Sequence, residues 1–475
     1  MPDAHSPTAE AGAPAPAADA VQRLVEPGTT AHELAELFAQ AGHELYLVGG
    51  SVRDAFLGLD PPDLDFATSA RPDDTRRVLR ACADDVWDTG ARFGTISGRK
   101  GGHHIEITTY RSDRYTPGSR HPDVDFGDDI TADLSRRDFT LNAIAVDVRD
   151  GSLLDPFDGL RDLRERRLRT PVEPEVSFAD DPLRMVRLAR FTSVLDAAPD
   201  PATEDAARRM AQQLDTISME RVRDELSKVL LGAAPARGLD LLVRCDLAQH
   251  VVPELLLLRE CRDPQHRHKD VYAHTLAVVE NCAPDLELRL AGLLHDVGKP
   301  ETRQIHRDGT VTFHHHEVVG ARIAKARLQA LRYDRHLVQN VTELVRLHLR
   351  FHTYRMGWTD SAVRRYVRDA GPLLEKLNAL TRADVTTANR AKAARIAKRM
   401  AELEQRIAEL REREELERLR PALDGNRIME HLGIPPGRDV GEAWNHLLEL
   451  RIERGPMTED EARAALDEWW AQRSG

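Results

Sequence analysis

The chain has 475 residues, with a hydrophobic fraction of 41%, a charged fraction of 31% and a formal net charge of −12. This length is too great for one hydrophobic core and fits three or four domains of ordinary size. The acidic balance excludes a protein that coats nucleic acid indiscriminately, because neutralisation of phosphates drives such binding. A specific RNA substrate needs a local cluster of arginines, and arginines do gather within residues 161–169 and 184–190.

Neither the cysteines nor the hydropathy indicates export. Cys82, Cys245, Cys261 and Cys282 form no CxxC pair, so the sequence predicts neither a disulfide framework nor a zinc knuckle. No apolar stretch approaches the roughly 18 residues that span a bilayer. A signal peptide carries positive charge near its start, whereas no Lys or Arg precedes Arg23. We therefore expect a cytoplasmic protein that does not enter a membrane.

The predicted elements divide the chain into five parts. Residues 1–28 begin with an Ala/Pro-rich stretch without apolar periodicity and are predicted to form a disordered tail. Residues 29–165 mix strand-like runs such as YLVGG, LDFAT and HHIEITTY with a few helical stretches, which indicates an α+β head. The remainder is predicted to be helical and to divide into residues 166–265, 266–390 and 391–475, with a break at CRDPQHRHK.

Hydrophobic periodicity alone does not assign a structure to two segments of the chain. Residues 391–420 form a highly charged Ala/Leu/Glu/Arg-rich helix that either pairs with another helix or serves as a solvated connector, and we favour the connector. The polar segment between Thr109 and Arg136 is long for a connection without structure. Loops of that length are usually functional or disordered. After PALDGNRIMEHLGIPPG, the sequence predicts a last small helical unit.

Residues 49–68 read GGSVRDAFLGLDPPDLDFAT and predict a phosphate site beside a metal site. The backbone N–H groups of Gly49, Gly50 and the following helix can face phosphate oxygens at the end of a buried strand. Asp63 and Asp65 alternate on a predicted strand and share one side of it, where two carboxylates can hold Mg²⁺ ions. A glycine pair or an Asp-x-Asp alone is usually a turn, but together they suit a nucleoside triphosphate with two metal ions.

Four motifs in this order resemble those of the DNA polymerase β-type nucleotidyltransferases. They are the string above, RRDFTLNA at 136–143, DPFDG at 155–159 and DDPLRMVRLARF at 180–191. The resemblance is to the class II branch, which contains CCA-adding tRNA nucleotidyltransferases and bacterial poly(A) polymerases. It implies that the last three motifs recognise the ribose, form a hinge and read the incoming base.

The resemblance also implies the roles of individual residues. Asp63 and Asp65 would bind two catalytic Mg²⁺ ions, and Glu106 is a candidate third carboxylate, with an ordinary outward-facing strand residue as the equal alternative. Arg53 could reach a phosphate in a bidentate manner, with Asp54 holding it or capping the helix. The implied nucleotide-binding residues are Gly49, Gly50, Arg53, Arg136, Arg137, Asp138, Asn142, Asp181, Arg184, Arg187 and Arg190.

Asp181 and Arg184 are predicted to share a face of one helix, three residues apart. A carboxylate acceptor beside a guanidinium donor can hydrogen-bond the edges of cytosine and of adenine in turn. A plain salt bridge is the alternative, and the relatives usually carry Glu-Asp where this chain has Asp180 and Asp181. In CCA-adding relatives a flexible loop corresponds to the segment after Thr109, and its presence favours addition of the complete CCA.

A second metal candidate lies in residues 266–390, where histidines are dense. The motif LLHDVGKP, with further helical histidines and an aspartate, resembles the HD phosphohydrolase superfamily. The resemblance implies one divalent metal on His274, His295, Asp296 and Asp384, and it implies that His316 and His348 help to hold a second. His314 and His315 are predicted to be bystanders. Some CCA-adding relatives carry such a domain with phosphatase or cyclic phosphodiesterase activity.

These expectations combine into an enzyme that uses CTP and ATP to add C, C and A to the 3′ end of tRNA. It would have an α+β polymerase β-like head with a mixed sheet at 29–165, a helical neck at 166–265, an HD domain at 266–390 and a tRNA-binding helical tail at 391–475. DNA and membranes are not expected partners. The alternatives are a poly(A) polymerase or a CC-only or A-only enzyme, an HD phosphohydrolase whose head only binds nucleotide, and a non-catalytic tRNA-binding protein.

Overall fold

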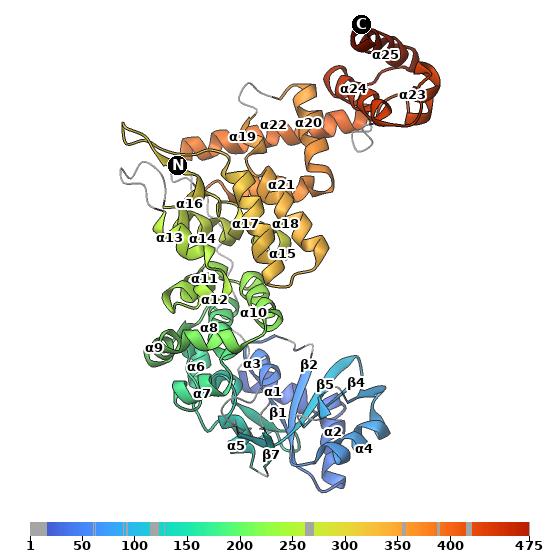
Figure 1. The fold of residues 1–475 in the computed structure, drawn as a ribbon. Helices are drawn as coiled ribbons and strands as arrows, with labels where there is room; N and C mark the ends of the chain where they lie inside the picture. Colours follow the sequence, from blue (N-terminus) through green and yellow to red (C-terminus); the bar gives the residue numbers. More distant parts are fainter. Residues whose placement is uncertain are drawn as a thin grey trace, which may run out of the picture. The chain divides into compact units, whose positions relative to one another are not determined.

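The computed structural model describes residues 17–474, except 60, 62, 89, 92–93, 115–122, 128, 262–269, 354–357, 387–389 and 415–419. The chain forms two compact units (Figure 1). Unit 1 comprises Met1–Ser218 and Arg244–His250, and unit 2 comprises Met219–Val243 and Val251–Gly475. Among the described residues, no helix combines the length and the apolar character needed to cross a membrane.

Unit 1 is built on a seven-stranded sheet in the order β3-β4-β5-β2-β1-β8-β9. Its strands are β1 (Leu45–Val48), β2 (Asp63–Thr68), β3 (Asp85–Trp87), β4 (Thr95–Lys100), β5 (His103–Thr109), β8 (Ala145–Asp147) and β9 (Leu153–Leu154). β2 pairs with β5 in parallel and with β1 antiparallel, so the sheet is mixed. The predicted α+β head with a mixed sheet is confirmed.

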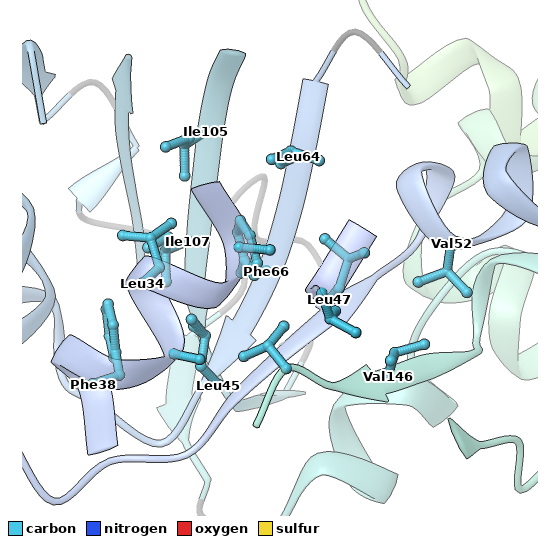
Figure 2. Packing of buried hydrophobic residues seen from close by; sticks show 14 of the residues in the cluster. Leu34, Phe38, Leu45, Leu47, Val52, Leu64, Phe66, Ile105, Ile107 and Val146 are labelled. Atoms are coloured by element: carbon cyan, nitrogen blue, oxygen red, sulfur yellow. The ribbon is translucent and has the colours of Figure 1, made fainter. Parts of the chain in front are cut away.

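One face of the sheet is covered by helices because alternate residues along the strands are apolar. Figure 2 shows Leu64 and Phe66 of β2 on the same side as Ile105 and Ile107 of β5, with Leu34 of α2 packed against them. The covering helices α2 (Thr30–Gln40) and α4 (Pro72–Cys82) lie beside these strands (Figure 1). The opposite face of β2 therefore carries Asp63 and Asp65, as the alternation in the sequence predicts.

The predicted disordered tail is wrong for its last part. Within residues 1–28, Ala17–Val25 forms helix α1, and Val21 and Val25 are buried in the core of the sheet unit. Apolar residues four apart on this short helix lie on one face and pack against the sheet unit. The stretch of the tail before residue 17 lies outside the described residues.

The long connection after Thr109 is not structureless throughout. β6 (Arg111–Arg114) and β7 (Asp123–Phe126) pair antiparallel, and α5 (Ile130–Ser135) follows them. The residues between the two strands lie outside the described part. Asp129 caps α5 by accepting a hydrogen bond from the backbone N–H of Thr131 at 2.8 Å. The segment thus reaches the motif at 136–143 through a helix.

The rest of unit 1 is mainly helical, and two of its arginines share one buried carboxylate. Its elements are the 3₁₀ helices η2 (Thr140–Asn142) and η3 (Ala211–Thr216), α3 (Gly50–Phe56), α6 (Gly159–Glu165), α7 (Pro174–Asp180), α8 (Leu183–Val194), α9 (Pro201–Met210), α12 (Ala248–Val251) and the paired β10 (Arg167–Leu168) and β11 (Ala198–Pro199). Arg167 and Arg169 both pair with the fully buried Asp162. The predicted arginine cluster at 161–169 is thus partly neutralised by the protein itself.

Unit 2 begins as a bundle of helices. These are α10 (Met219–Leu231), α11 (Pro235–Arg244), α13 (Glu254–Glu260), α14 (Val271–Asn281), α15 (Leu286–Leu294), α16 (Lys299–Thr302), α17 (His316–Ala330), α18 (Arg335–Leu347), α19 (Arg350–Thr353), α20 (Asp360–Ala370), η4 (Gly371–Leu373) and α21 (Leu374–Ala383), with a β12 (Arg303–Ile305) and β13 (Val311–Phe313) hairpin. α17 packs along α18, and α15 packs against α14, α18 and α21. The predicted change to a helical chain is confirmed.

The predicted solvated connector is wrong. α22 (Arg390–Glu414) buries Met400, Leu403, Ile407 and Leu410, which recur every three or four residues, and it packs against α20. This apolar stripe was hidden in the sequence by the many charges on the other faces.

The C-terminal helices α23 (Gly425–Leu432), α24 (Arg438–Arg454) and α25 (Glu459–Ser474) form their own core. They are tied to α20 and α22 by a buried ion-pair cluster. Arg364 of α20 donates to both carboxylate oxygens of Glu414 at 2.7 and 2.8 Å and to the carbonyl oxygen of Ile452 at 3.0 Å. Arg451 of α24 donates to the same carboxylate. The predicted last helical unit is present and anchored.

Candidate active site

A cleft of about 320 Å³ opens in unit 1 where α3 begins. Gly49 and Gly50 form one wall of it, and Gly49 has a φ of +72°, a value that favours glycine. A Cβ on Gly49 would lie 3.0 Å from Arg137 Nη1 and 3.6 Å from Asp65 Oδ2. The glycine pair therefore leaves room for a ligand between a guanidinium and a carboxylate.

Asp65 forms the carboxylate side of the cleft and lies in a row of acidic residues. In the register of the sheet, Asp65 is opposite Glu106, and Asp63 is opposite His104. Burial, together with Glu106 and Asp63, raises the pKa of Asp65 to about 6, although Arg137 opposes the shift. Carboxylate oxygens of this kind suit Mg²⁺.

A serine fixes the distance between α3 and the acidic strand. Ser51 Oγ donates to the carbonyl oxygen of Asp63 at 3.0 Å and accepts from the backbone N–H of Asp65 at 2.9 Å. The motif did not predict this role of Ser51, because β2, the strand that Ser51 contacts, begins 12 residues later in the chain.

Five arginines line the cleft, namely Arg111, Arg136, Arg137, Arg184 and Arg187. Asp133 holds two of them: Arg136 donates to its Oδ1 at 2.9 and 3.0 Å, and Arg137 donates to its Oδ2 at 3.2 Å. Burial alone would raise the pKa of Asp133, but the two arginines outweigh it and hold that pKa below its ordinary value. The sequence analysis missed both Asp133 and Arg111.

Asp138 and Asn142 form the next part of the lining and explain where Arg53 points. Asn142 Nδ2 donates to Asp138 Oδ1 at 2.9 Å, and Arg53 Nη1 donates to Asn142 Oδ1 at 2.8 Å. Arg53 also donates to Asp54 and lies 5.3 Å from the centre of the Phe191 ring. Arg53 is not among the residues that line the cleft, and it supports the Asn142 side chain. Its contact with a phosphate stays a prediction.

The prediction that Asp181 and Arg184 share one helix is wrong, although both line the cleft. α7 ends at Asp180, Asp181 is extended with φ −143° and ψ 98°, and α8 starts at Leu183. The cause is Pro182, since a residue before proline is kept out of the helical region. The carboxylate therefore comes from a break between helices and the guanidinium from the first turn of α8.

Arg184 is held rigidly and still has donors to offer. Its Nη1 donates to the Ser177 side chain at 2.8 Å and to the Ser177 carbonyl oxygen at 3.2 Å, and its Nη2 donates to the Arg136 carbonyl oxygen. A guanidinium has five N–H donors. These contacts within the described residues use three, which leaves two on adjacent nitrogens for a ligand.

Most of the sequence-predicted head residues are thus brought together. Those that line the cleft are Gly49, Gly50, Asp65, Arg136, Arg137, Asp138, Asn142, Asp181, Arg184 and Arg187. Asp63 and Glu106 lie beside it on the same sheet face. Arg190 is not in the lining; its guanidinium lies 4.7 Å from the centre of the Phe191 ring.

In unit 2 the six predicted metal ligands converge from α14 and α17 and from the turns that follow α15, α18 and α21. They form two groups whose donor atoms lie within 4.8 Å of one another: His274, His295 and Asp384, and Asp296, His316 and His348. Asp296 reaches both groups, because its Oδ2 lies 3.1 Å from His295 Nε2 and its Oδ1 lies 3.3 Å from His316 Nε2. The exposed bystander His315 belongs to neither group.

Hydrogen bonds orient each of these imidazoles. His295, His316 and His348 direct Nδ1 to the carbonyl oxygens of Gly292, Phe313 and Val345 at 2.7 to 2.8 Å. His274 Nδ1 contacts Thr386 Oγ1 at 2.6 Å. An Nδ1–H bonded to a carbonyl leaves Nε2 as the lone-pair donor, which is the arrangement of metal-binding histidines. His348 Nε2 is buried without a hydrogen-bond partner among the described residues, so its lone pair can bind a metal ion.

The charges at this second site also suit a cation. Burial lowers the pKa of His348 to about 3, so this imidazole is neutral. Burial would raise the pKa of Asp296, but His295 and Lys299 outweigh it and hold that pKa well below its ordinary value. The Lys299 ammonium lies 2.5 Å from Asp296 Oδ2. Imidazole nitrogens together with carboxylate oxygens form a donor set that suits a divalent transition metal.

Three family models match the chain in the order of its elements. The poly A polymerase head domain matches residues 45–169, the probable RNA and SrmB-binding site of polymerase A matches residues 198–258, and the HD domain matches residues 271–389. The A-adding tRNA nucleotidyltransferase of Deinococcus radiodurans is 33% identical over 445 residues, which cover 90% of this chain and 96% of that enzyme.

The chain belongs to the tRNA nucleotidyltransferase family. Other members are more similar over a shorter stretch. The CCA-adding enzyme of Levilactobacillus brevis is 40% identical over 231 residues, 48% of this chain, and that of Lactococcus lactis is 40% identical over 230 residues. The matched stretch spans only 57% and 56% of these two enzymes.

Solved structures of the family share the fold. The CCA-adding enzyme of Bacillus stearothermophilus in complex with CTP has a TM-score of 0.69 at 27% identity, covering 96% of this chain and 98% of that one. The Thermotoga maritima CCA-adding enzyme complexed with tRNA has a TM-score of 0.60 at 19% identity, covering 96% and 99%. The predicted resemblance to class II nucleotidyltransferases with an HD domain is confirmed.

Proposed function

We propose that this family member transfers nucleotides from CTP and ATP to the 3′ end of tRNA and completes the CCA sequence. The observation that carries the proposal is the cleft itself, in which Asp65 faces five arginines and the Asp181–Arg184 pair. A triphosphate needs several cationic groups, and a base needs a mixed donor and acceptor edge. The cleft offers both beside the acidic residues.

Each part of the cleft has a role in this proposal. The N–H groups of Gly49 and Gly50 and the guanidiniums of Arg136 and Arg137 bind and orient the triphosphate. Asp63 and Asp65, with Glu106 beside them, would hold Mg²⁺. When bound, such ions activate the attacking 3′-hydroxyl and neutralise charge on the leaving pyrophosphate. Ser51 keeps the carboxylates at a fixed distance from the phosphate wall.

Asp181 and Arg184 select the base. Arg184, which donates three hydrogen bonds within the protein, has two N–H donors left, and Asp181 offers an acceptor. Cytosine and adenine both combine an exocyclic amine with a neighbouring ring acceptor, so one donor and acceptor pair can serve each of them. The similar Bacillus stearothermophilus CCA-adding enzyme was solved in complex with CTP, one of the two nucleotides that this pair would read.

The family contains an alternative to complete CCA addition. The Deinococcus radiodurans relative, similar over 90% of this chain, is an A-adding enzyme, so addition of the terminal A alone is the second candidate. The polar segment after Thr109 favours complete CCA addition in the relatives that carry it, and residues 115–122 of it lie outside the described part.

A primer-extension assay tests the proposal. Purified protein with Mg²⁺ and tRNA transcripts ending before CCA or after CC would receive CTP, ATP or both, with products resolved to one nucleotide. We expect two additions with CTP and a third only with ATP. Extension of the CC-ending transcript alone would establish the A-adding alternative. Arg184→Ala should lose selectivity between the four nucleotides, and unchanged selectivity would refute the base-reading role.

A second activity is proposed for unit 2, where the six ligands converge. We infer that divalent metal held by these residues supports hydrolysis of phosphoesters, with Asp296 shared between the two groups of ligands. Asp63→Ala should abolish nucleotide addition while phosphatase activity on p-nitrophenyl phosphate with Mn²⁺ or Ni²⁺ persists. Asp296→Ala should do the reverse. Loss of both activities in either variant would contradict two independent sites.

A further inference from the structure

The sheet face that carries the acidic residues continues past them to β3 at the far edge of the sheet. Along β2, β5, β4 and β3, the residues that point away from the helix-covered face include Asp65, Glu106, Ser97 and Trp87, which are register partners in turn. Strands lie about 4.8 Å apart. One row therefore leads from the acidic site to the indole of Trp87 across three strand spacings.

Trp87 and His104 form a small aromatic surface on this row. Their ring centres lie 5.5 Å apart at an interplanar angle of 31°, and His104 Nδ1 lies 3.9 Å from Asp63 Oδ1. Trp87 is 37% exposed, and the His104 side chain is 37% exposed. Residues 89, 92 and 93 lie outside the described part. Trp87 does not belong to the hydrophobic core that contains Ile96 and Ile105.

The charges around this surface decide which part of a substrate it can take. All five arginines line the cleft together with Asp65, and none of them belongs to β3, β4 or β5, so the triphosphate belongs in the cleft. On the Trp87 side, Asp63 and Glu106 repel phosphates, and Arg99 is paired with Asp85 at 2.6 Å. A nucleic-acid strand held here must therefore bind through its bases, and base–aromatic stacking does not depend on charge or sequence.

We propose that Trp87, with His104 beside it, is the stacking platform for the bases at the 3′ end of the RNA substrate. The proposal rests on the proposed nucleotide transfer, since the strand whose terminal hydroxyl reacts at Asp63 and Asp65 has to approach them from the side opposite the triphosphate. The platform is continuous with the acidic site through the contact between His104 and Asp63. It holds the strand in place while its terminal base changes from one addition to the next.

Kinetics of tRNA extension test the platform by separating binding from chemistry. Trp87→Ala should raise the KM for tRNA about fivefold or more, since loss of one stacked base costs at least that factor. Its kcat and its KM for CTP should stay within about twofold. Trp87→Phe keeps an aromatic ring and should restore most of the affinity. Leu153→Ala, a truncation of a 45% exposed side chain on β9 at the other end of the sheet, is the matched control.

A binding measurement without nucleotides distinguishes failure of this proposal from failure of the proposed function. A tRNA transcript with 2-aminopurine as its 3′-terminal base should lose fluorescence on binding, and Trp87→Ala should reduce that loss while Trp87→Phe retains it. If the wild type extends tRNA but quenching and KM do not depend on Trp87, the platform is refuted and the transfer stands. If the quenching depends on Trp87 but no nucleotide is added, the platform stands and the transfer is refuted.

Discussion

At the scale of single residues, the cleft depends on a carboxylate that belongs to none of the four motifs. Asp133 is fully buried, and it carries a charge that only Arg136 and Arg137 compensate in the described structure. Both arginines line the cleft and are proposed to bind the triphosphate. Removing Asp133 would thus leave two guanidiniums close together without the group that separates and orients them.

We expect Asp133→Asn to lower the free energy of unfolding by about 3 kcal/mol, the usual cost of breaking a buried ion pair. The pKa of Asp133 lies below its ordinary value, so its contribution is complete above about pH 4 and is lost as the pH falls further. The variant should lose less stability than the wild type between pH 5 and pH 3. Urea unfolding at several pH values measures both effects.

The control for this experiment is Asp73→Asn, which removes a carboxylate that pairs with Arg76 but is 86% exposed. We expect a change of at most about 0.5 kcal/mol there, because exposed ion pairs contribute little. The KM for CTP should rise in Asp133→Asn and stay constant in Asp73→Asn. An Asp133→Asn protein as stable as the wild type would show that Arg136 and Arg137 are compensated by other groups.

At the scale of elements, the helices and strands that were predicted correctly are those whose pattern lies in residues next to one another. The strand YLV, the glycine turn and the alternation of Asp63 and Asp65 follow from residues next to one another, and β1, α3 and β2 appear where expected. The regular apolar spacing of RMVRLARF likewise appears as α8. Periodicity reports such local features because burial acts on every second or every third to fourth residue.

The parts that sequence reasoning missed have causes far along the chain or hidden by composition. Asp133 and Ser177 act on arginines that other motifs supply, and Trp87 acquires its neighbour only when β3, β4 and β5 pair. The prediction that Asp181 lies in a helix was wrong, although the residue that keeps Asp181 out of the helix, Pro182, was visible in the sequence. The charged helix α22 was assigned to solvent because its apolar stripe is narrow.

At the second site, the loop that carries Asp296 approaches α17 closely at Gly298. An added Cβ on Gly298 would lie 2.1 Å from the carbonyl oxygen of His316 and 2.6 Å from the backbone nitrogen of Gly320. Gly298→Ala must push α17 away from the loop that carries Asp296, and it should cost about 1 to 3 kcal/mol as overpacking does. His316 would leave Asp296, so Mn²⁺ affinity measured by calorimetry should fall at least tenfold.

Gly441→Ala is the matched control, because an added Cβ on that helical glycine meets nothing within 4 Å. Its metal affinity should equal that of the wild type, and its stability should not fall, since alanine is the better helix former. Nucleotide addition should persist in both variants. Normal Mn²⁺ binding by Gly298→Ala would mean that His316 is not needed for the metal.

At the scale of the whole molecule, the two compact units place the two proposed chemistries in separate bodies. The cleft is made only of residues of unit 1, and the six histidine and aspartate ligands all belong to unit 2. The chain passes between the units more than once, since Arg244–His250 belongs to unit 1 while the residues on both sides of it belong to unit 2. Separate cores can unfold separately, so each site should stabilise its own unit.

We therefore expect calorimetry to resolve two thermal transitions that respond to different ligands. A ligand at about 100 times its Kd adds about 2.7 kcal/mol to the stability of the state that binds it. For a body of about 200 residues, this amounts to roughly 5 to 10 °C in the midpoint. CTP with Mg²⁺ should raise one transition, Mn²⁺ without nucleotide should raise the other, and Asp65→Ala and Asp296→Ala should cancel these shifts selectively. A single transition that responds to both ligands would mean that the crossing segments couple the units into one cooperative body, in which case a change at either site would alter the stability of the other.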